Sequence, residues 1–103
     1  MVVIKKDGSR QSFDRGKVLR GMIRACEKRP VPLAELERIA DEIEQELQNS
    51  MEREIRTEDV GEKVMDRLRK VDQVAYVRFA SVYRQFKDLD TFMAELNKLL
   101  AEK

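Results

Sequence analysis

The hydrophobic and polar positions of the chain follow two patterns, that of β-strands and that of helices. The strand pattern comes first and is short. Residues 2–4 are β-branched, and they lead through Lys5 and Lys6 to the pair Asp7-Gly8. An Asp-Gly pair after a β-rich run is a strong hairpin signal. We expect residues 10–13 to return as a second strand. Because an isolated two-stranded ribbon is marginally stable in water, it should pack against the rest of the chain.

Five later segments carry apolar residues at the spacing of a helix. Asp14 is a suitable N-cap for the first segment, whose helical spacing continues past Cys26 and Lys28 until Pro30 ends it, and Thr57 is a suitable N-cap for the third. Pro30 and Pro32 separate the first two helices. The predicted helices are the segment after Asp14, residues 33–48, the segment from Thr57 to a break near residues 70–72, residues 73–86, and a last helix from Asp90.

A third short strand is expected over residues 53–56. Two or three strands with four to five helices predict a small α+β domain, in which a β-sheet caps a helical bundle. Gly16 and Gly21 lie inside the first predicted helix, which each weakens by up to ~1 kcal/mol relative to Ala. Such glycines mark either close packing or a close ligand.

The fourth predicted helix carries a stripe of aromatic residues. Tyr76, Phe79, Tyr83 and Phe86 follow one another at steps of 3, 4 and 3 residues, with Val74, Val77 and Ser81 on another side. A helix that is apolar around most of its circumference is either central to a fold or shared with a partner. We expect two of the four aromatic side chains in the core, and a subunit contact remains an alternative.

The composition excludes several classes of protein. Without His, no Ser-His-Asp or Cys-His nucleophile can form, and the single Cys26 allows neither an intrachain disulfide nor a Cys-based structural zinc site. No apolar run approaches the ~20 residues that span a membrane, and no signal-peptide pattern follows Met1. We therefore expect a cytoplasmic domain without zinc or membrane contact.

Catalysis is also not expected. The four glycines match neither a P-loop nor a dinucleotide-binding fingerprint. The carboxylates of residues 35–59 resemble a solvated helix face, so the chain is not expected to be an enzyme. A metal would be held by carboxylates alone, as Mg²⁺ carried with a nucleotide.

The formal net charge of +1 conceals a polarised chain. Residues 1–30 carry nine Lys/Arg and three Asp/Glu, net +6, whereas residues 31–60 carry three and ten, net −7. A basic end indicates an anionic partner. The alternative is that it neutralises the acidic middle of the chain within one fold.

Three lysines are the candidate anion ligands. Lys5 and Lys6 would alternate across the first strand, one pointing to each face, with Val3 on the face of Lys5. Lys17 lies in the first turn of the first helix, where free N–H groups and the helix dipole attract anions. Lysines around one helix N-terminus would suit a polyphosphate; the alternative is solvated lysines beside a turn.

These residues resemble a known family. The sequences VIKKDG at residues 3–8 and FDRGKV at 13–18 resemble the opening of the ATP-cone domain, the nucleotide-sensing module at the front of many ribonucleotide reductases. The sequences EKRPV at 27–31 and VAYVRFASVYR at 74–84 resemble the cone of the bacterial transcriptional repressor of ribonucleotide reductase genes. The resemblance covers about residues 2–93 and leaves residues 94–103 as a C-terminal helical tail.

The resemblance implies a helical bundle capped by a small sheet, with ATP and dATP, one or two per cone, as ligands. It implies that Lys17 meets the phosphates and that Thr57 contacts nucleotide, as in some cones. Tyr83, and less clearly Tyr76, would lie on the helix that completes the site and its subunit contacts. The residues it assigns to nucleotide binding are Val3, Lys5, Lys6, Lys17, Thr57 and Tyr83.

The resemblance also implies a mechanism, in which the bound nucleotide changes how cones assemble into homo-oligomers. The repressor binds operators through a four-cysteine zinc ribbon that precedes its cone and is absent from this sequence, so we expect nucleotide binding with poor DNA binding. Two alternatives stay open. One is the allosteric cone of a ribonucleotide reductase, and the other is a helical interaction or DNA-binding module that needs no nucleotide.

Overall fold

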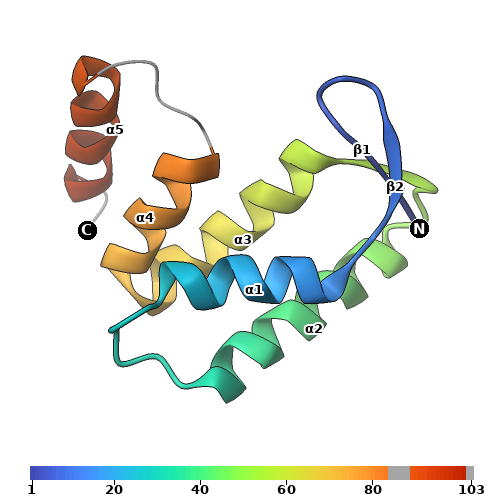
Figure 1. Cartoon of the computed structure of the whole chain (residues 1–103), viewed down its shortest axis with the longest axis horizontal. Helices are drawn as coiled ribbons and strands as arrows, with labels where there is room; N and C mark the ends of the chain where they lie inside the picture. The colour runs from blue at the N-terminus through green and yellow to red at the C-terminus, as the bar shows by residue number, and fades with distance from the viewer. Residues whose placement is uncertain (84–88, 102–103) are drawn as a thin grey trace.

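The computed structural model describes residues 1–83 and 89–101, where three strands and five helices form the predicted α+β domain (Figure 1). The strands are β1 (Val2–Ile4), β2 (Arg10–Ser12) and β3 (Glu54–Arg56). In the order β2-β1-β3, the central strand runs antiparallel to β2 and parallel to β3. The sheet lies at one end of the molecule.

The Asp-Gly hairpin is confirmed, but the lysines do not lie on the strand. The Gly8 N–H donates to the Lys5 carbonyl oxygen at 2.9 Å, and Gly8 has a φ of +87° that favours glycine. Because β1 ends at Ile4, Lys5 and Lys6 lie beyond the strand in the connection to β2. The predicted alternation of these lysines across the sheet is therefore wrong.

Most helices begin and end close to the predicted positions, but the first ends at Ala25, before the predicted stop at Pro30, and Lys28 has a positive φ of 62° that no α-helix accommodates. The helices are α1 (Arg15–Ala25), α2 (Leu33–Asn49), α3 (Thr57–Val71), α4 (Gln73–Tyr83) and α5 (Leu89–Ala101). The Asp14 carboxylate caps α1 by accepting the Lys17 N–H at 3.2 Å, as predicted. The predicted N-cap role of Thr57 is wrong. The cap position falls on Arg56, the last residue of β3, so Thr57 is already the first helical residue. The predicted end of the fourth helix at Phe86 lies outside the described residues.

The core lies between the first four helices. The five apolar residues of the α2 stripe are all buried, and α3 adds Val64, Met65 and Leu68 to the same core. Tyr76 on α4, only 7% exposed, is a core residue. The buried residues of the α2 stripe are Leu36, Ile39, Ala40, Ile43 and Leu47.

Polar contacts fix α4 against α1. The Arg78 guanidinium donates to the carbonyl oxygens of Ala25 and Glu27, at the C-terminal end of α1, at 3.3 and 2.6 Å. Arg29, in the connection after α1, donates to Asp72, which directly precedes α4. These contacts anchor the start and the middle of α4 to the C-terminal end of α1 and to the connection that follows it.

Candidate functional site

A cavity of about 540 Å³ opens between the hairpin, α1, α3 and the end of α4. Its volume falls within the 300–1,000 Å³ of small-molecule sites. The sheet register explains part of its lining, because Val3 pairs with Gln11 and with Ile55 and thus shares a face of the sheet with both. Ile55 is buried in the core, whereas Val3 and Gln11 line the cavity.

The cavity has an apolar interior and a charged border. Apolar side chains come from all four elements: Val3, Phe13, Val18, Val60, Val64, Phe79 and Tyr83. The polar lining residues are Lys5, Lys6, Asp7, Gln11, Ser12, Asp14, Lys17 and Thr57. Such a lining suits a ligand with one flat apolar part and one strongly polar part.

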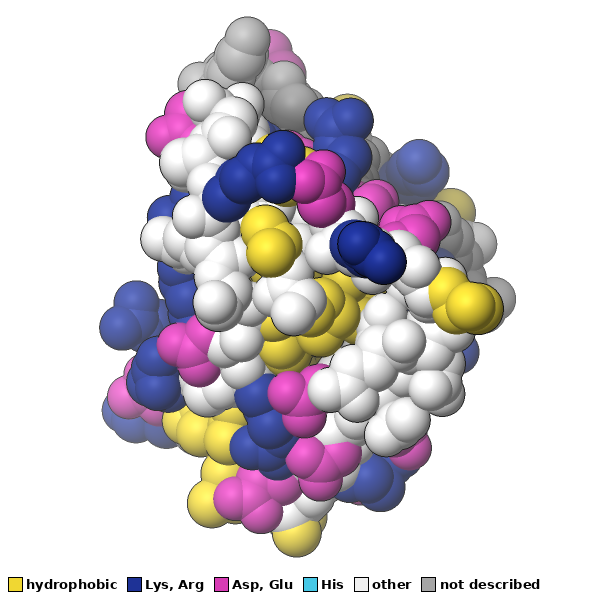
Figure 2. All heavy atoms as spheres, turned by 90° about the vertical axis from the view of Figure 1, so that its right-hand side faces the viewer, with side chains coloured by type: hydrophobic (Ala, Val, Ile, Leu, Met, Phe, Trp, Pro, Cys, Tyr) yellow, Lys and Arg dark blue, Asp and Glu magenta, His cyan; other side chains and the backbone are white. Residues whose placement is uncertain are grey.

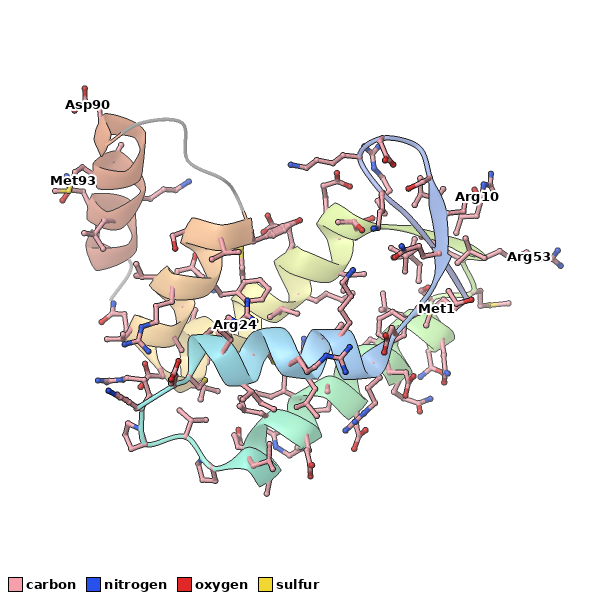
Figure 3. The ribbon with its side chains drawn as sticks, viewed as in Figure 1. Met1, Arg10, Arg24, Arg53, Asp90 and Met93 are labelled. Carbon is pink, nitrogen blue, oxygen red and sulfur yellow. The ribbon has the colours of Figure 1, made fainter. Side chains whose placement is uncertain are left out.

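Among the described residues, the three lysines at the cavity have no close ion-pair partner. Lys5, Lys6 and Lys17 make no ion pair with any residue in the described ranges 1–83 and 89–101. Other cations of the basic end are paired: Arg10 with Glu54, and Arg15 with Asp41 at 2.7 Å. Arg10 points away from the helices on the outer side of the sheet (Figure 3). Part of the basic end therefore neutralises the acidic middle, while the lysines at the cavity do not.

The outer face at the sheet end is not uniformly basic. Lys, Arg, Asp and Glu side chains are mixed across it, and apolar side chains show between them at its centre (Figure 2). Asp7 at the hairpin turn accepts the Ser9 N–H at 2.9 Å. This contact with Ser9, together with the charge of Lys5, holds the pKa of Asp7 below its ordinary value. The excess of positive charge is thus local to the cavity rather than spread over the face.

Two helices begin at the cavity. The first turn of α1 contributes Lys17. The carboxylate of Asp14, which caps this helix, also lies 3.7 Å from the Arg20 guanidinium. The first residue of α3, Thr57, lines the cavity as well, and no side-chain hydrogen bond caps that helix. Free N–H groups and the positive dipole end of α3 favour an anion, whereas the carboxylates of Glu58 and Asp59 in the same first turn oppose one.

The end of α4 forms an aromatic wall of the cavity. The Phe79 and Tyr83 rings stack with centroids 5.9 Å apart and planes 21° from parallel. The Tyr83 hydroxyl donates to the Glu58 carbonyl oxygen at 2.8 Å, in the first turn of α3. The wall is therefore tied to the helix that carries Thr57.

The structure brings all six predicted site residues to this one cavity. Their roles in binding stay predictions. The lysines of the hairpin and of α1 line the same cavity, although Lys5 and Lys6 reach it from the connection after β1 rather than from a strand. Tyr76 does not line the cavity, since it is buried in the core. The sequence reasoning missed Phe79 and Gly61 as lining residues. Phe79 could have been found from the aromatic stripe, which places it one turn before Tyr83.

Within residues 1–83 and 89–101, no group of three or more His, Cys, Asp or Glu side chains is arranged to hold a metal ion. None of the helices in the described part of the chain combines the length and apolar character needed to cross a membrane. Asp7 and Asp14 are the carboxylates among the described residues that line the cavity.

Comparisons with known proteins agree with one another. The family model described as the ATP cone domain matches residues 1–89. The chain is 64% identical over 103 residues to the "Transcriptional repressor NrdR" of Alkaliphilus metalliredigens, covering 100% of the chain and 66% of that protein. Identity to the proteins of the same name is 61% over 103 residues in Acetivibrio thermocellus, with 100% and 68% covered, and 61% over 102 residues in Brevibacillus brevis, with 99% and 64% covered. The chain thus spans about two thirds of the length of these relatives.

Proposed function

The chain belongs to the ATP-cone domain family, and we propose that it is a nucleotide-sensing regulatory domain that binds ATP and dATP in the cavity between the hairpin, α1 and α3. The observation that carries the proposal is the presence of Lys5, Lys6 and Lys17 together in the lining of one largely apolar cavity. The polyphosphate would meet the lysines, and the nucleoside would enter the apolar interior.

Each part of the cavity then has a role in binding. Lys17 and the N-terminus of α1 neutralise phosphate charge, and Lys5 and Lys6 close over the phosphates from the hairpin turn. Thr57 and the start of α3 approach the nucleotide from the other side. Val3 and the aromatic wall of Phe79 and Tyr83 offer flat apolar surfaces to the nucleoside.

Mg²⁺ would enter with the nucleotide rather than occupy a site of its own. Nucleotide-bound Mg²⁺ typically keeps phosphate oxygens, waters and one or two carboxylates as ligands. Asp7 and Asp14 are the carboxylates at the cavity among the described residues, and Asp14 is already engaged as the cap of α1. Asp7 likewise accepts a backbone N–H, that of Ser9, so each of the two carboxylates already has a partner in the chain.

The names of the relatives support a proposal for the process that nucleotide binding regulates. Proteins 57–64% identical to the chain are named transcriptional repressors, and we propose that this domain regulates such a repressor of ribonucleotide reductase genes in the cytoplasm, without catalysis. Operator binding would belong to a zinc ribbon in the part of the relatives that this chain does not cover. The bound nucleotide would act by favouring one homo-oligomer over another, because a ligand shifts an equilibrium only if it binds one state better.

ATP and dATP differ by a single 2′-hydroxyl group, so a switch between them must rest on one hydrogen bond or one close contact. Coupling between a ligand site and assembly is typically worth ~1–3 kcal/mol. A difference of that size is sufficient to change which oligomer dominates at a fixed protein concentration.

Calorimetric titration of the purified chain with ATP, dATP and GTP tests the proposal. ATP and dATP should bind, and Lys17→Ala should weaken both about tenfold or more, since a charge-assisted bond to phosphate is lost. Lys70→Ala is the matched control, because Lys70 is an exposed helix lysine that pairs with Asp66 and does not line the cavity. Unchanged binding by Lys17→Ala would reject this site, and a flat trace for the wild type at millimolar dATP would reject the function.

A further inference from the structure

Two glycines inside helices line the cavity, and each faces an aromatic ring of α4. A Cβ atom added at Gly21 on α1 would lie 3.5 Å from the Phe79 ring, which is an ordinary van der Waals contact. A Cβ atom added at Gly61 on α3 would lie 2.0–2.4 Å from three carbons of the Tyr83 ring. The Tyr83 ring therefore rests directly on the backbone of α3, at a distance that only glycine permits.

The Tyr83 ring is held on two further sides. Its hydroxyl donates to the Glu58 carbonyl oxygen at 2.8 Å, one turn before Gly61, and its face stacks on Phe79. Gly61 itself is buried. The ring thus bridges the first turns of α3 and the end of α4, and it forms the wall of the cavity nearest to Thr57.

We propose that Gly61 positions Tyr83 as a wall of the nucleotide site and thereby sets the affinity of the domain for nucleotide. The inference rests on the proposed function. Gly61 contributes no atom that contacts the nucleotide. Because it has no side chain, the Tyr83 ring can lie against the surface of α3.

The effect of a methyl group at residue 61 falls on the site rather than on the fold. The conflicting atoms lie at the far end of the Tyr83 side chain, which can turn about its own torsion angles, so the ring moves and the helix does not. Ala is also the better helix former by roughly 1 kcal/mol. A displaced ring loses the bond to Glu58 and either enters the cavity or leaves the wall open.

The test compares Gly61→Ala with Gly21→Ala in calorimetric titrations with dATP. Both variants add one methyl group to a helical glycine that lines the same cavity and faces an α4 ring, but only Gly61→Ala conflicts with that ring. We expect Gly61→Ala to weaken dATP binding about tenfold or more, the scale of one methylene group misplaced in a binding pocket. Gly21→Ala measures what a methyl group in the cavity costs without a conflict with a ring, and its loss should be clearly smaller than that of Gly61→Ala. Lys70→Ala, on α3 but outside the cavity, should bind as the wild type does, and circular dichroism should show all three variants folded.

A double variant separates positioning from a general disturbance of α3. In a Tyr83→Ala background no ring occupies the surface of α3, so adding Gly61→Ala should change the affinity no further. An additional loss of the same size as in the wild-type background would overturn the inference, because the methyl group would then act without the ring.

The ring itself can be observed without nucleotide. The chain has two tyrosines, Tyr76 and Tyr83, and no Trp. In NMR spectra of protein with labelled tyrosine rings, Tyr76→Phe assigns the Tyr83 signal. Gly61→Ala should shift that signal, and Gly21→Ala should leave it in place.

The outcomes distinguish the two proposals. A wild-type protein that binds dATP, together with a Gly61→Ala variant of equal affinity, overturns the role of Gly61 and leaves the proposed function standing. A wild-type protein that does not bind dATP overturns the proposed function, and the role of Gly61 in binding with it.

Discussion

The junction between α3 and α4 depends on one carboxylate, that of Asp72. Its side chain is nearly buried at 9% exposure, accepts both contacts from Arg29 Nε at 3.0 and 3.1 Å, and accepts the Ala75 N–H at 2.9 Å. Burial alone would raise the pKa of Asp72, but the hydrogen bonds from Ala75 and Arg29 outweigh it and hold the pKa below its ordinary value of 3.8. The ionised carboxylate is therefore the form that stabilises the fold.

This predicts a pH-dependent contribution of Asp72 to stability. Because the pKa in the folded protein is depressed, the contribution is present above about pH 4 and is lost as the pH falls through the folded pKa. Asp72→Asn should lower the free energy of unfolding at pH 7 by about 1 kcal/mol, since Asn can still cap α4 but loses the charged contact with Arg29. Urea unfolding at several pH values measures it.

Measurements at low pH show whether the charge of Asp72 is responsible for the difference in unfolding free energy. Wild type and Asp72→Asn should approach each other in unfolding free energy as the pH falls from about 4 through the depressed pKa of the folded carboxyl group. A difference in unfolding free energy that stays constant from pH 7 down to pH 3 would show that the charge of Asp72 contributes nothing.

Single residues also show what the sequence could reveal. Lys5 and Lys17 were identifiable because Lys5 precedes the turn signal Asp7-Gly8 and Lys17 lies in the first turn of a helix that Asp14 caps. The contacts of Asp72 and Gly61 were not identifiable, because both depend on where α4 packs. Neither the bond from Arg29 to Asp72 nor the contact of Tyr83 with Gly61 leaves a local pattern in the sequence.

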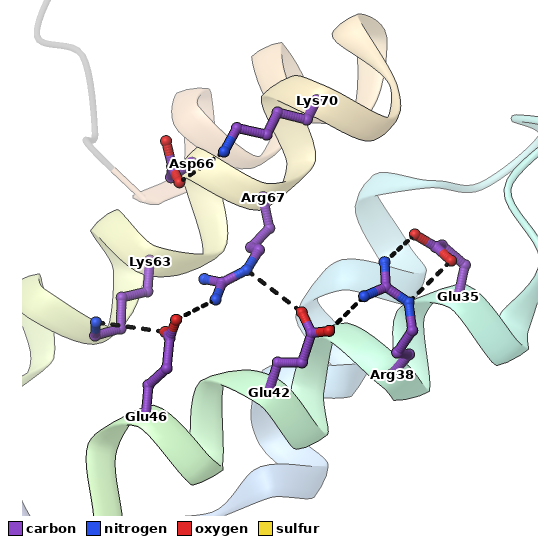
Figure 4. Close-up of polar contacts among 8 residues, drawn as sticks. All are labelled: Glu35, Arg38, Glu42, Glu46, Lys63, Asp66, Arg67 and Lys70. Atoms are coloured by element: carbon purple, nitrogen blue, oxygen red, sulfur yellow. Dashed lines mark hydrogen bonds and ion pairs between the residues drawn. The ribbon is translucent and has the colours of Figure 1, made fainter. Parts of the chain in front are cut away.

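At the scale of elements, α2 and α3 are joined by a row of charged side chains (Figure 4). Arg67 on α3 reaches across to Glu46 at 2.5 Å and Glu42 at 3.7 Å on α2. The hydrogen bond from Arg67, aided by the charge of Lys63, lowers the pKa of Glu46. Arg38 bonds Glu35 and Glu42 of its own helix. Arg67 is thus the residue of this row that connects α2 and α3 most closely.

We predict that Arg67→Ala lowers the free energy of unfolding by about 1 kcal/mol, because it removes a cross-helix network and the packing of a side chain that is only 20% exposed. Arg38→Ala is the matched control, since it removes pairs within one helix and should cost less. Urea unfolding in low and high salt measures both, and the Arg67 effect should shrink as salt rises. Equal losses for the two variants would contradict a cross-helix role.

The elements themselves were largely predictable. The α2 stripe and the end of α3 near Asp72 follow from periodicity and from charged breaks in it. The end of β1 was not predictable, because β-branched and charged residues are both compatible with a longer strand. The turn that Gly8 closes begins at Lys5. Lys5 and Lys6 therefore lie in this turn, not on opposite faces of a strand, and both line the cavity.

At the scale of the whole molecule, the proposed switch is an equilibrium between assemblies. The cavity is closed on one side by the end of α4, so a ligand that contacts Tyr83 contacts α4 as well as the hairpin, α1 and α3. Nothing in the sequence indicates which oligomers form, since association depends on surfaces that only the folded chain creates. The assembly switch therefore stays a prediction.

We predict that sedimentation velocity separates three samples of the protein, without nucleotide, with ATP and with dATP, by their weight-average coefficients. The expected difference follows from linkage, because a nucleotide that binds one assembly better must shift the distribution. Tyr83→Ala should reduce the response as well as the affinity. Superimposable profiles for all three samples at saturating nucleotide would remove the switch.

The most direct test of the account is a crystal structure of the protein with dATP. The account predicts electron density for a triphosphate within hydrogen-bonding distance of the Lys5 and Lys17 ammonium groups, and for a nucleoside between Val3 and the aromatic wall. A nucleotide bound elsewhere on the protein, with this cavity empty in the same crystal, would contradict it.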